Sequence, residues 1–403
     1  MCDSALVDYQ LSLTDKIFMN VQASQNKKSG KITGQSAINK VLSFLHLWLG
    51  LAAGIVLIVV ALTGSILTFE EELTPVLFAK EQRVNSMQTR LSADSLVTIA
   101  KTVYPKDKIF RMVFPAEADR SIKATFGTKK KGYKYVYINP YTGEILSNGA
   151  ENKRFFPVVL NIHRYLLAGD FGKAITGISC AITFFLACSG LYLWWPKNKK
   201  VLKQRLKVKT DASFKRVNWD LHGVGCFYAM SGLVIITLTG LIWSYDWVEN
   251  LLFTITNSKI EKTEVVENPN LNAKKVSGIY EIIVSKSNEI YTHRGKMTIT
   301  FPDKKDKSIL LAKENDDQAT SAADQLFFDS KTAHLIRAKS FAQLDLGNKI
   351  RKLNKPIHTG SIFGWPTKIL AFLTTLITAS LPITGLLIYL GKKKKVKKKP
   401  VLS

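Results

Sequence analysis

Four long apolar stretches without a charged residue constrain this chain more than any other feature of its sequence. Each is about 22 residues long and contains no Lys, Arg, Asp or Glu: Leu47–Phe69, Ala174–Trp195, Gly223–Tyr245 and Ile369–Leu390. A helix that crosses the roughly 30 Å hydrocarbon core of a bilayer needs about 20 apolar residues. Buried helices of soluble proteins are seldom so long or so uniformly apolar. The chain is therefore expected to cross a membrane four times, which excludes a soluble globule.

The positive charge of the chain predicts its orientation in that membrane. The 403 residues include 57 Lys and Arg against 31 Asp and Glu, a formal net charge of +26. Residues 1–43, 197–218 and 392–403 hold 21 Lys and Arg and four acidic residues, so they carry +17 of this charge. Loops rich in Lys and Arg stay in the cytoplasm. Both termini and the 197–218 loop are therefore expected to be cytoplasmic.

The same charge does not indicate a nucleic-acid partner. The basic run Lys392–Lys399 adjoins a span and contains no aromatic residue on which a base could stack. The first 40 residues are polar, so no cleavable signal peptide is expected. Met19 offers an alternative start, since residues 1–18 resemble neither a targeting signal nor a domain.

The segments between the spans give the expected organisation of the chain. Its parts are a cytoplasmic tail (1–40), a first span (41–70), a first external domain (71–155), an interfacial segment with the second span (156–196), a basic cytoplasmic loop (197–218), a third span (219–247), a second external domain (248–355), an interfacial segment with the fourth span (356–391) and a basic cytoplasmic tail (392–403). Both external domains have the pattern of small α+β units.

Each external domain is predicted to open with a helix and to continue in strands. The helices are expected at Ser92–Tyr104 and Val276–Ser287. The strands are expected at Phe110–Phe114, Lys134–Asn139 and Glu144–Leu146, and at Lys296–Phe301, Ser308–Lys313, Gln325–Asp329 and His334–Ile336. Neither segment contains a cysteine, because Cys180, Cys188 and Cys226 fall in spans and Cys2 in the N-terminal tail. Cysteine-based chemistry is therefore excluded there.

The two halves of the chain repeat each other at fixed spacings, which indicates an internal duplication. A histidine precedes a Thr-Gly pair by 18 residues in one span of each half, and a Ser-Gly or Thr-Gly pair by 27 residues in the other. These sets are His46 with Thr63-Gly64, His222 with Thr239-Gly240, His163 with Ser189-Gly190, and His358 with Thr384-Gly385. The external turns Asn139–Ile145 and Asp329–Leu335 also align.

Four of the six histidines thus occupy equivalent edges of the four spans. Ionisable residues at membrane depth are costly and mark function, and imidazole is a common ligand of metals and haem iron. The topology sorts these residues into an inner pair, His46 and His222, and an outer pair, His163 and His358. The sequence therefore predicts two bis-histidine sites, one near each face of the membrane.

Glycines and helix breaks add detail to these sites. Eighteen residues are five helical turns, or about 27 Å, so Gly64 and Gly240 lie near the outer surface. These glycines either let a flat macrocycle approach the backbone or serve ordinary helix packing. Gly50 and Cys226 lie four residues after the inner histidines, and the same two roles are open for them. Twenty-seven residues would make about 40 Å of helix, longer than the membrane core. We therefore expect short outer segments for His163 and His358, ended by breaks at 169–172 and 363–366.

The ordered set of motifs, which covers about residues 38–392, resembles PepSY-associated transmembrane proteins. It comprises the Leu-His and Thr-Gly spans, the Ile-His-Arg-Tyr-Leu-Leu-Ala-Gly-Asp-Phe-Gly segment from Ile162, and the Tyr-Ile-Asn-Pro-Tyr-Thr-Gly-Glu-Ile-Leu turn from Tyr137. This family includes iron-regulated inner-membrane ferric-siderophore reductases with two b-type haems. The implied fold class is membrane α-helical, with four transmembrane helices as two duplicated pairs and two small α+β PepSY-like periplasmic domains. The resemblance also implies a bacterial inner membrane and haem iron bound by His46, His163, His222 and His358.

Two departures from the family pattern matter. Thr332-Ala333-His334 replaces Thr-Gly-Glu in the second external turn, which is therefore expected to be degenerate. Some relatives carry a fused flavodoxin-like module. Because this chain has neither that module nor a Gly-rich phosphate loop, its electron donor is expected to be separate, either a quinol or a cytoplasmic flavoprotein.

The remaining candidate residues are weaker. Arg164, Arg154 and Arg351 lie near the outer histidines and are candidate partners of haem propionates, although each also fits a solvated interfacial charge. His293 and His334 fit lone structural histidines better than metal ligands. The tryptophans near the span ends fit an interfacial belt better than an electron path: Trp194, Trp195, Trp243, Trp247 and Trp365. No catalytic side chain is assigned.

Two functions from different classes follow from the sequence. The first is a haem protein that passes electrons across the membrane to reduce ferric siderophores outside. Bis-histidine ligation leaves no open iron position, so oxygen activation is disfavoured. The alternative is a membrane PepSY protein that is not an enzyme and that binds or restrains a periplasmic protease. A transporter is disfavoured, because the spans offer no ionisable group at the midplane.

Overall fold

The four charge-free stretches form four long helices in the computed structural model. They are α2 (Ala37–Thr68), α7 (Gly169–Trp194), α9 (Phe214–Ser244) and α13 (Trp365–Lys397), and each is long and apolar enough to cross a membrane. All four extend beyond the charge-free stretches, because helix formation continues through the polar residues that flank them. The prediction of a multi-pass membrane protein, with lipid around its spans, is confirmed.

The structure describes residues 37–128, 130–196, 198–260, 266–269, 272–302, 307–316 and 322–397. The predictions for Cys2, Met19 and most of the N-terminal tail lie outside these residues. Contacts divide the chain into two units, Met1–Trp48 and Leu49–Ser403, whose relative placement is not determined. In the first unit the described residues form the start of α2, where the rings of Phe44 and Trp48 pack one helical turn apart.

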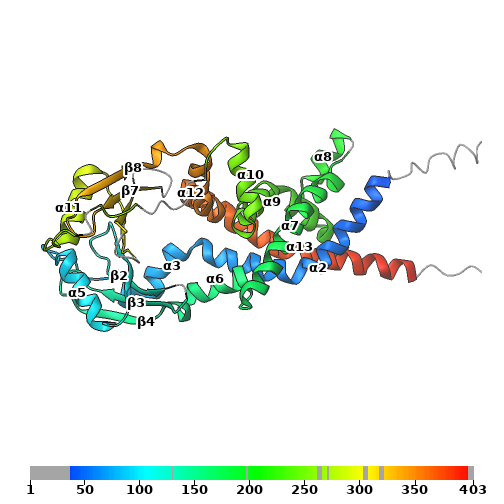
Figure 1. Ribbon diagram of the computed structural model, residues 1–403. Helices are drawn as coiled ribbons and strands as arrows, with labels where there is room; N and C mark the ends of the chain where they lie inside the picture. The colour runs from blue at the N-terminus through cyan, green and yellow to red at the C-terminus, as the bar shows by residue number, and fades with distance from the viewer. Residues whose placement is uncertain are drawn as a thin grey trace, which may run out of the picture. The chain divides into compact units, whose positions relative to one another are not determined.

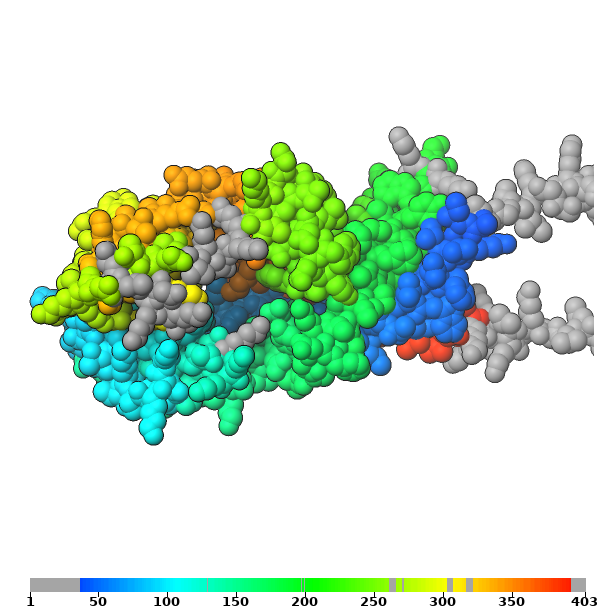
Figure 2. Space-filling view, viewed as in Figure 1, coloured from blue at the N-terminus to red at the C-terminus, as the bar shows by residue number. Residues whose placement is uncertain are grey.

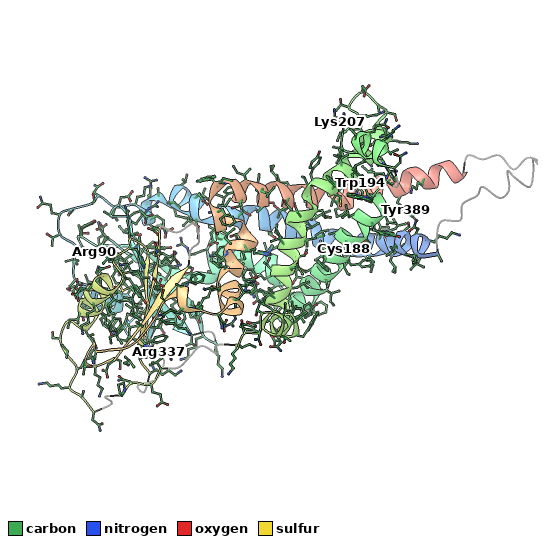
Figure 3. All side chains as sticks on the ribbon, turned by 90° about the horizontal axis from the view of Figure 1, so that it is seen from above. Arg90, Cys188, Trp194, Lys207, Arg337 and Tyr389 are labelled. Carbon is green, nitrogen blue, oxygen red and sulfur yellow. The ribbon has the colours of Figure 1, made fainter. Side chains whose placement is uncertain are left out.

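Helices α7, α9 and α13 pack side by side in the second unit (Figure 1). Figure 3 shows Arg90 and Arg337 in the sheet region, and Trp194, Lys207 and Tyr389 at the opposite end of these helices. The basic loop that contains α8 (Lys199–Arg205) is therefore at the end of the unit away from the sheet. This arrangement agrees with the predicted sorting of loops to two sides.

Short helices precede the second and fourth spans, as the 27-residue spacing predicts. They are α6 (Phe155–Tyr165) and α12 (Leu346–Thr359). The chain leaves α6 through Leu166 and Leu167, both with positive φ, and it leaves α12 through Gly360 at φ 76°. At Gly172, a Cβ atom would lie 1.6 Å from the carbonyl oxygen of Tyr165. Only glycine lets the chain fold back this tightly, so α6 and α7 are separate helices.

The strands of both external segments form one antiparallel sheet of eight strands, in the order β4-β3-β2-β1-β5-β6-β7-β8 (Figure 1). Their bounds are β1 Ile109–Phe114, β2 Ile122–Thr128, β3 Gly132–Ile138, β4 Ile145–Ala150, β5 Met297–Thr300, β6 Ile309–Glu314, β7 Ala323–Phe328 and β8 Leu335–Lys339. At the junction of the segments, Met112 of β1 pairs with Ile299 of β5. All the predicted strands are present, and β2 was not predicted.

One hydrophobic core serves both external segments, rather than one core for each. Helices α5 (Ala93–Val103) and α11 (Ile279–Ile290) cover the same face of the sheet. Leu96 and Met112 from the first segment and Ile283 and Leu311 from the second are fully buried in a single cluster. The expectation of two small domains is therefore corrected in this respect: α+β structure is present, but its sheet and core are shared.

The two covering helices cap each other's N-termini. The Glu281 carboxylate of α11 accepts a hydrogen bond from the Ala93 N–H of α5 at 2.6 Å. In return, the Asp94 carboxylate of α5 accepts from the N–H groups of Tyr280 and Glu281 at 3.0 and 2.9 Å. Each carboxylate thus satisfies unpaired donors of the neighbouring helix. This exchange ties the two segments together on the sheet face away from the spans.

The remaining helices connect these parts. They are α3 (Glu70–Leu77), α4 (Ala79–Gln82), α10 (Asp246–Ile255) and the 3₁₀ turns η1 (Glu151–Lys153), η2 (Phe341–Gln343) and η3 (Ser361–Phe363). The ammonium group of Lys368, at the start of α13, is buried against the carboxylates of Glu72 at 2.5 Å and Glu71 at 3.4 Å. This ion pair connects the start of α13 with α3 on the sheet side of the spans.

Candidate histidine site

The short helices α6 and α12 bring two histidines close together. The ring centroids of His163 and His358 are 6.2 Å apart, with an angle of 71° between the ring planes. We call these residues the sheet-side pair; they are the predicted outer pair. Both residues are half-buried. The sequence predicted this pairing from topology alone.

The hydrogen bonds of His163 fix the position of its ring proton. Its Nδ1 lies 2.9 Å from the carbonyl oxygen of Val60 on α2 and 3.1 Å from the Thr63 hydroxyl. A carbonyl only accepts hydrogen bonds, and the Thr63 hydroxyl already donates to the carbonyls of Val59 and Val60. His163 Nδ1 must therefore carry the hydrogen, which leaves Nε2 with a free lone pair.

His358 has the same arrangement on the other side. Its Nδ1 lies 2.9 Å from the hydroxyl of Thr239 on α9, and that hydroxyl donates to the carbonyls of Ile235 and Ile236. Nδ1 of His358 is thus a donor as well, and its Nε2 is free to act as a ligand. Burial lowers the pKa of His358 to about 3 and also lowers the pKa of His163. Both imidazoles are therefore neutral, the form that binds metals.

This pair fits a shared metal ion. Two imidazoles on opposite sides of one ion, each bound at roughly 2.0 Å, would place their ring centroids about 6 Å apart, and the 6.2 Å between the rings of His163 and His358 is compatible with this. Metal-binding histidines usually donate their other ring N–H to a protein oxygen, as both residues do. The donor set is two neutral imidazoles with fixed rings, which suits haem iron.

The glycines next to the threonines make room for the imidazole rings. A Cβ atom on Gly64 would lie 3.2 Å from Cε1 of His163, and one on Gly240 would lie 3.6 Å from Cε1 of His358 and 3.2 Å from Sγ of Cys180. Gly64 is thus nearest to His163, whereas Gly240 is nearest to Cys180 of α7, which is a contact of ordinary helix packing; access for a macrocycle stays a prediction. Each glycine admits the histidine that the preceding threonine binds.

His222 on α9 has the same kind of partners. Its Nδ1 lies 2.8 Å from the hydroxyl of Thr384 on α13, and a Cβ atom on Gly385 would lie 3.4 Å from its Cε1. Thr384 donates to two carbonyls of its own helix, so His222 also donates from Nδ1. His46 lies on α2 in the first unit, and its pairing with His222 stays a prediction. At Gly50, the nearest side chain to an added Cβ is Leu186.

Asparagines one turn before two of the histidines were not predicted. Asn354 Nδ2 donates to the Thr239 carbonyl at 3.1 Å, and Asn218 Nδ2 donates to the Thr384 carbonyl at 3.1 Å. Each asparagine lies four residues before its histidine, so the two share one helix face. The Thr hydroxyls were also missed, although the repeated Thr-Gly pair was a visible signal. Sequence reasoning used only the glycine of that pair.

The three candidate arginines have different surroundings. The guanidinium of Arg164 lies over the Tyr165 ring, and its charge helps to lower the pKa of both sheet-side histidines. Among the described residues it has no carboxylate partner. Arg154 is instead paired with Glu81 at 2.9 Å, and Arg351 is paired with Glu249. Arg164 is therefore a cation beside the histidines, whereas Arg154 and Arg351 are held in ion pairs; a propionate role for any of the three stays a prediction.

The other two histidines lie in the sheet region. His293 Nε2 is 3.1 Å from the Asp324 carboxylate, and the His334 side chain is exposed. Neither is near the sheet-side pair in the fold. Trp194 stacks on Phe227, whereas the Trp243 ring meets the ring of His358 with centroids 5.1 Å apart. Trp243 therefore has a contact with the sheet-side pair in addition to its place at the end of a span.

A cavity of about 720 Å³ lies between the sheet and helices α9, α10 and α12. Figure 2 shows the surface hollowed between the sheet and α10, with orange atoms of α12 at the bottom of the hollow. Sheet residues such as Phe110 and Phe327 line one side, and Trp243 and Asn354 line the other. The cavity thus reaches the residues that contact His358 and its partner Thr239.

The family model of the PepSY-associated TM region matches residues 44–392. The chain belongs to this family. The PepSY-associated TM match includes all four candidate histidines and the Thr-Gly or Ser-Gly pair of every span. It also includes the whole eight-stranded sheet. A search of curated proteins finds no significant match.

Proposed function

We propose that this protein is a haem-containing oxidoreductase that passes electrons across a bacterial inner membrane to ferric siderophores in the periplasm. The observation that carries the proposal is the sheet-side pair, with both Nδ1 atoms donating and both Nε2 atoms free to bind. In this proposal His163 and His358 bind the first b-type haem. His46 and His222 bind the second, on the sequence argument and on the matching hydrogen bond of His222.

The residues around each histidine have defined tasks in this function. Thr63, Thr239 and Thr384 hold the imidazoles in the tautomer that binds iron. Arg164 supplies positive charge for a propionate beside the sheet-side pair. A bis-histidine haem, when bound, takes up and releases single electrons without an open iron position. Each electron reduces one ferric ion to ferrous iron, which oxygen ligands of a chelate hold less tightly.

Orientation and origin belong to the same proposal. We place the sheet in the periplasm as a pair of PepSY-like repeats, and the basic loops and both termini in the cytoplasm. The four spans are then two duplicated helix pairs. The electron enters from a separate donor on the cytoplasmic side, a quinol or a reduced flavoprotein. Ferric iron is the substrate and leaves as ferrous iron.

The absorption spectrum of the purified protein tests this function. We expect a Soret band, sharp bands on reduction with dithionite, and about two haems per chain. The H163A and H358A variants should each lose about half of the haem, and H222A should lose the other half. H334A is the matched control, because His334 is exposed and away from the spans. A haem-free protein from haem-sufficient cells, or the loss of both haems in H163A, would contradict the proposal.

A further inference from the structure

The two faces of the sheet have different surroundings. Alternate residues of a strand point to opposite faces. One face, with Leu311 and Leu326, packs in the core under α5 and α11. The opposite face, which includes Phe110, Leu310 and Phe327, lines the cavity. This second face is turned toward the helices that carry the sheet-side pair.

The equivalent place in the first half is filled by side chains. By strand register, Tyr135 and Tyr137 of β3 correspond to Gln325 and Phe327 of β7. The guanidinium of Arg154 lies 4.4 and 5.0 Å from the centres of those two tyrosine rings and is paired with Glu81. In the second half the space beside Gln325 and Phe327 is a cavity of about 720 Å³. The space beside the sheet is therefore filled by side chains in the first half and open in the second half, although the two halves have the same fold.

The cavity has the composition of a ligand site. Its volume lies within the roughly 300–1,000 Å³ typical of sites for small organic ligands. Four cationic residues line it, Lys307, Lys339, Arg351 and Lys352, against two acidic residues, Asp246 and Glu249. Four aromatic rings also line it, from Phe110, Trp243, Phe301 and Phe327, and such rings stack on flat organic groups. An anionic ligand with aromatic groups matches both features.

The inner end of the cavity reaches the histidine site by two contacts. Trp243 lines the cavity and meets the His358 ring. Asn354, only 1% exposed, lines the cavity and donates to the Thr239 carbonyl. Its Oδ1 has no hydrogen-bond partner among the described residues. A buried acceptor without a partner is costly, and a ligand O–H or N–H group in the cavity would satisfy it.

We propose that this cavity binds the iron chelate, that the chelate is anionic and carries aromatic groups of the catecholate type, and that Trp243 separates it from His358. This assignment rests on the proposed function for the identity of the ligand. The site itself rests on the filled and open halves of the sheet. Lys339, on the last strand, supplies positive charge, and Gln325 leaves the space that Tyr135 occupies in the first half.

Binding of redox-inert gallium complexes to the full chain in detergent tests the site without electron transfer. Isothermal titration calorimetry would compare a strongly anionic gallium tris-catecholate with a cationic gallium tris-hydroxamate that carries a free amine. We expect the anionic complex to bind at least tenfold more tightly. K339E should weaken this binding at least tenfold, and K339R should restore it. K101E changes the net charge equally on exposed α5, outside the cavity, and should leave binding unchanged.

A second variant removes the space instead of the charge. Q325Y introduces the side chain found at the equivalent position of the first half, so the fold should tolerate it, and it should abolish binding. Equal binding of the two gallium complexes, or undiminished binding in both K339E and Q325Y, would overturn the proposed site. Chelate binding by a protein without haem would uphold the site and refute the proposed electron transfer. A haem-loaded protein that does not bind the anionic complex would refute the site alone.

Discussion

At the scale of single residues, the hydroxyl of each Thr-Gly pair determines the state of a histidine. A threonine hydroxyl has one hydrogen to donate, and Thr63, Thr239 and Thr384 each donate it to their own helix backbone. The hydroxyl oxygen is then available only as an acceptor toward the histidine. The same local arrangement therefore appears three times on different pairs of elements.

Replacing Thr239 with valine tests this role. The substitution removes the acceptor for His358 Nδ1–H; at the haem that we propose, this lowers the basicity of the imidazole and favours ferrous iron. We expect the midpoint potential of one haem to rise by roughly 20–60 mV, which corresponds to a net hydrogen bond of about 0.5–1.5 kcal/mol. A redox titration followed by absorbance measures this change in midpoint potential. T237V is the control, because Thr237 bonds only its own helix through its hydroxyl; an equal shift there would argue against the assignment.

Sequence reasoning located the histidines and glycines of the site but not their contacts. The equal spacings of the repeat identified His163, His358, Gly64 and Gly240 without a structure. The hydroxyl and asparagine partners come from other helices, up to 166 residues away in the case of Asn218 and Thr384. No local pattern reports such a contact. The cavity was missed for the same reason, because it lies between elements distant in sequence.

At the scale of elements, the two external turns have the same hydrogen bonds despite different residues. Asn139 Oδ1 accepts from the N–H groups of Tyr141 and Thr142, as Asp329 Oδ1 accepts from those of Lys331 and Thr332. Ala333 has φ 55° where Gly143 has φ 76°. The expectation of a degenerate second turn is therefore wrong. A buried alanine tolerates the left-handed conformation here because the core holds its methyl group.

The two turns should differ in their response to substitution at this position. In G143A, the new Cβ would lie 2.8 Å from Cδ1 of Ile99 at a positive φ, so we expect a loss of about 2–3 kcal/mol in unfolding free energy. In A333G, relief of strain offsets the lost methyl contact and the added chain entropy, so the change should stay within about 0.5 kcal/mol. Urea unfolding in detergent measures the unfolding free energy of both variants. A larger loss in A333G than in G143A would contradict this account.

At the scale of the whole molecule, the shared sheet was the least predictable feature. Helix caps and turns gave α5 and most strands from local residues, for example the Ser92 cap. The pairing of β1 with β5 has no local signal, because each strand alone is an ordinary alternating segment. Strand β2 was missed although Ile122, Ala124 and Phe126, which face the core, alternate with polar residues. Only the three-dimensional arrangement makes the two external segments one unit.

Truncation of Met112 tests whether the sheet is one cooperative unit. Met112 is fully buried on β1 beside the junction with β5, so M112A should cost about 2–5 kcal/mol. Hydrogen exchange of α5 and α11 should speed up by similar factors, because both helices cover the same core. The exposed variant K101A is the control. Faster exchange in α5 alone would show that the two segments unfold independently.

The junction of β1 with β5 also sets the order of events during synthesis of the protein. Helices α7 and α9 lie between these strands in the chain, so both must enter the membrane before the partner of β1 exists. Until then β1 is a sheet edge with unpaired backbone groups, the kind of edge that recruits foreign strands. Closing such a distant contact is slow. The first four strands therefore depend on protection from aggregation during synthesis, and slow insertion of α9 should expose the nascent chain to proteolysis at this edge.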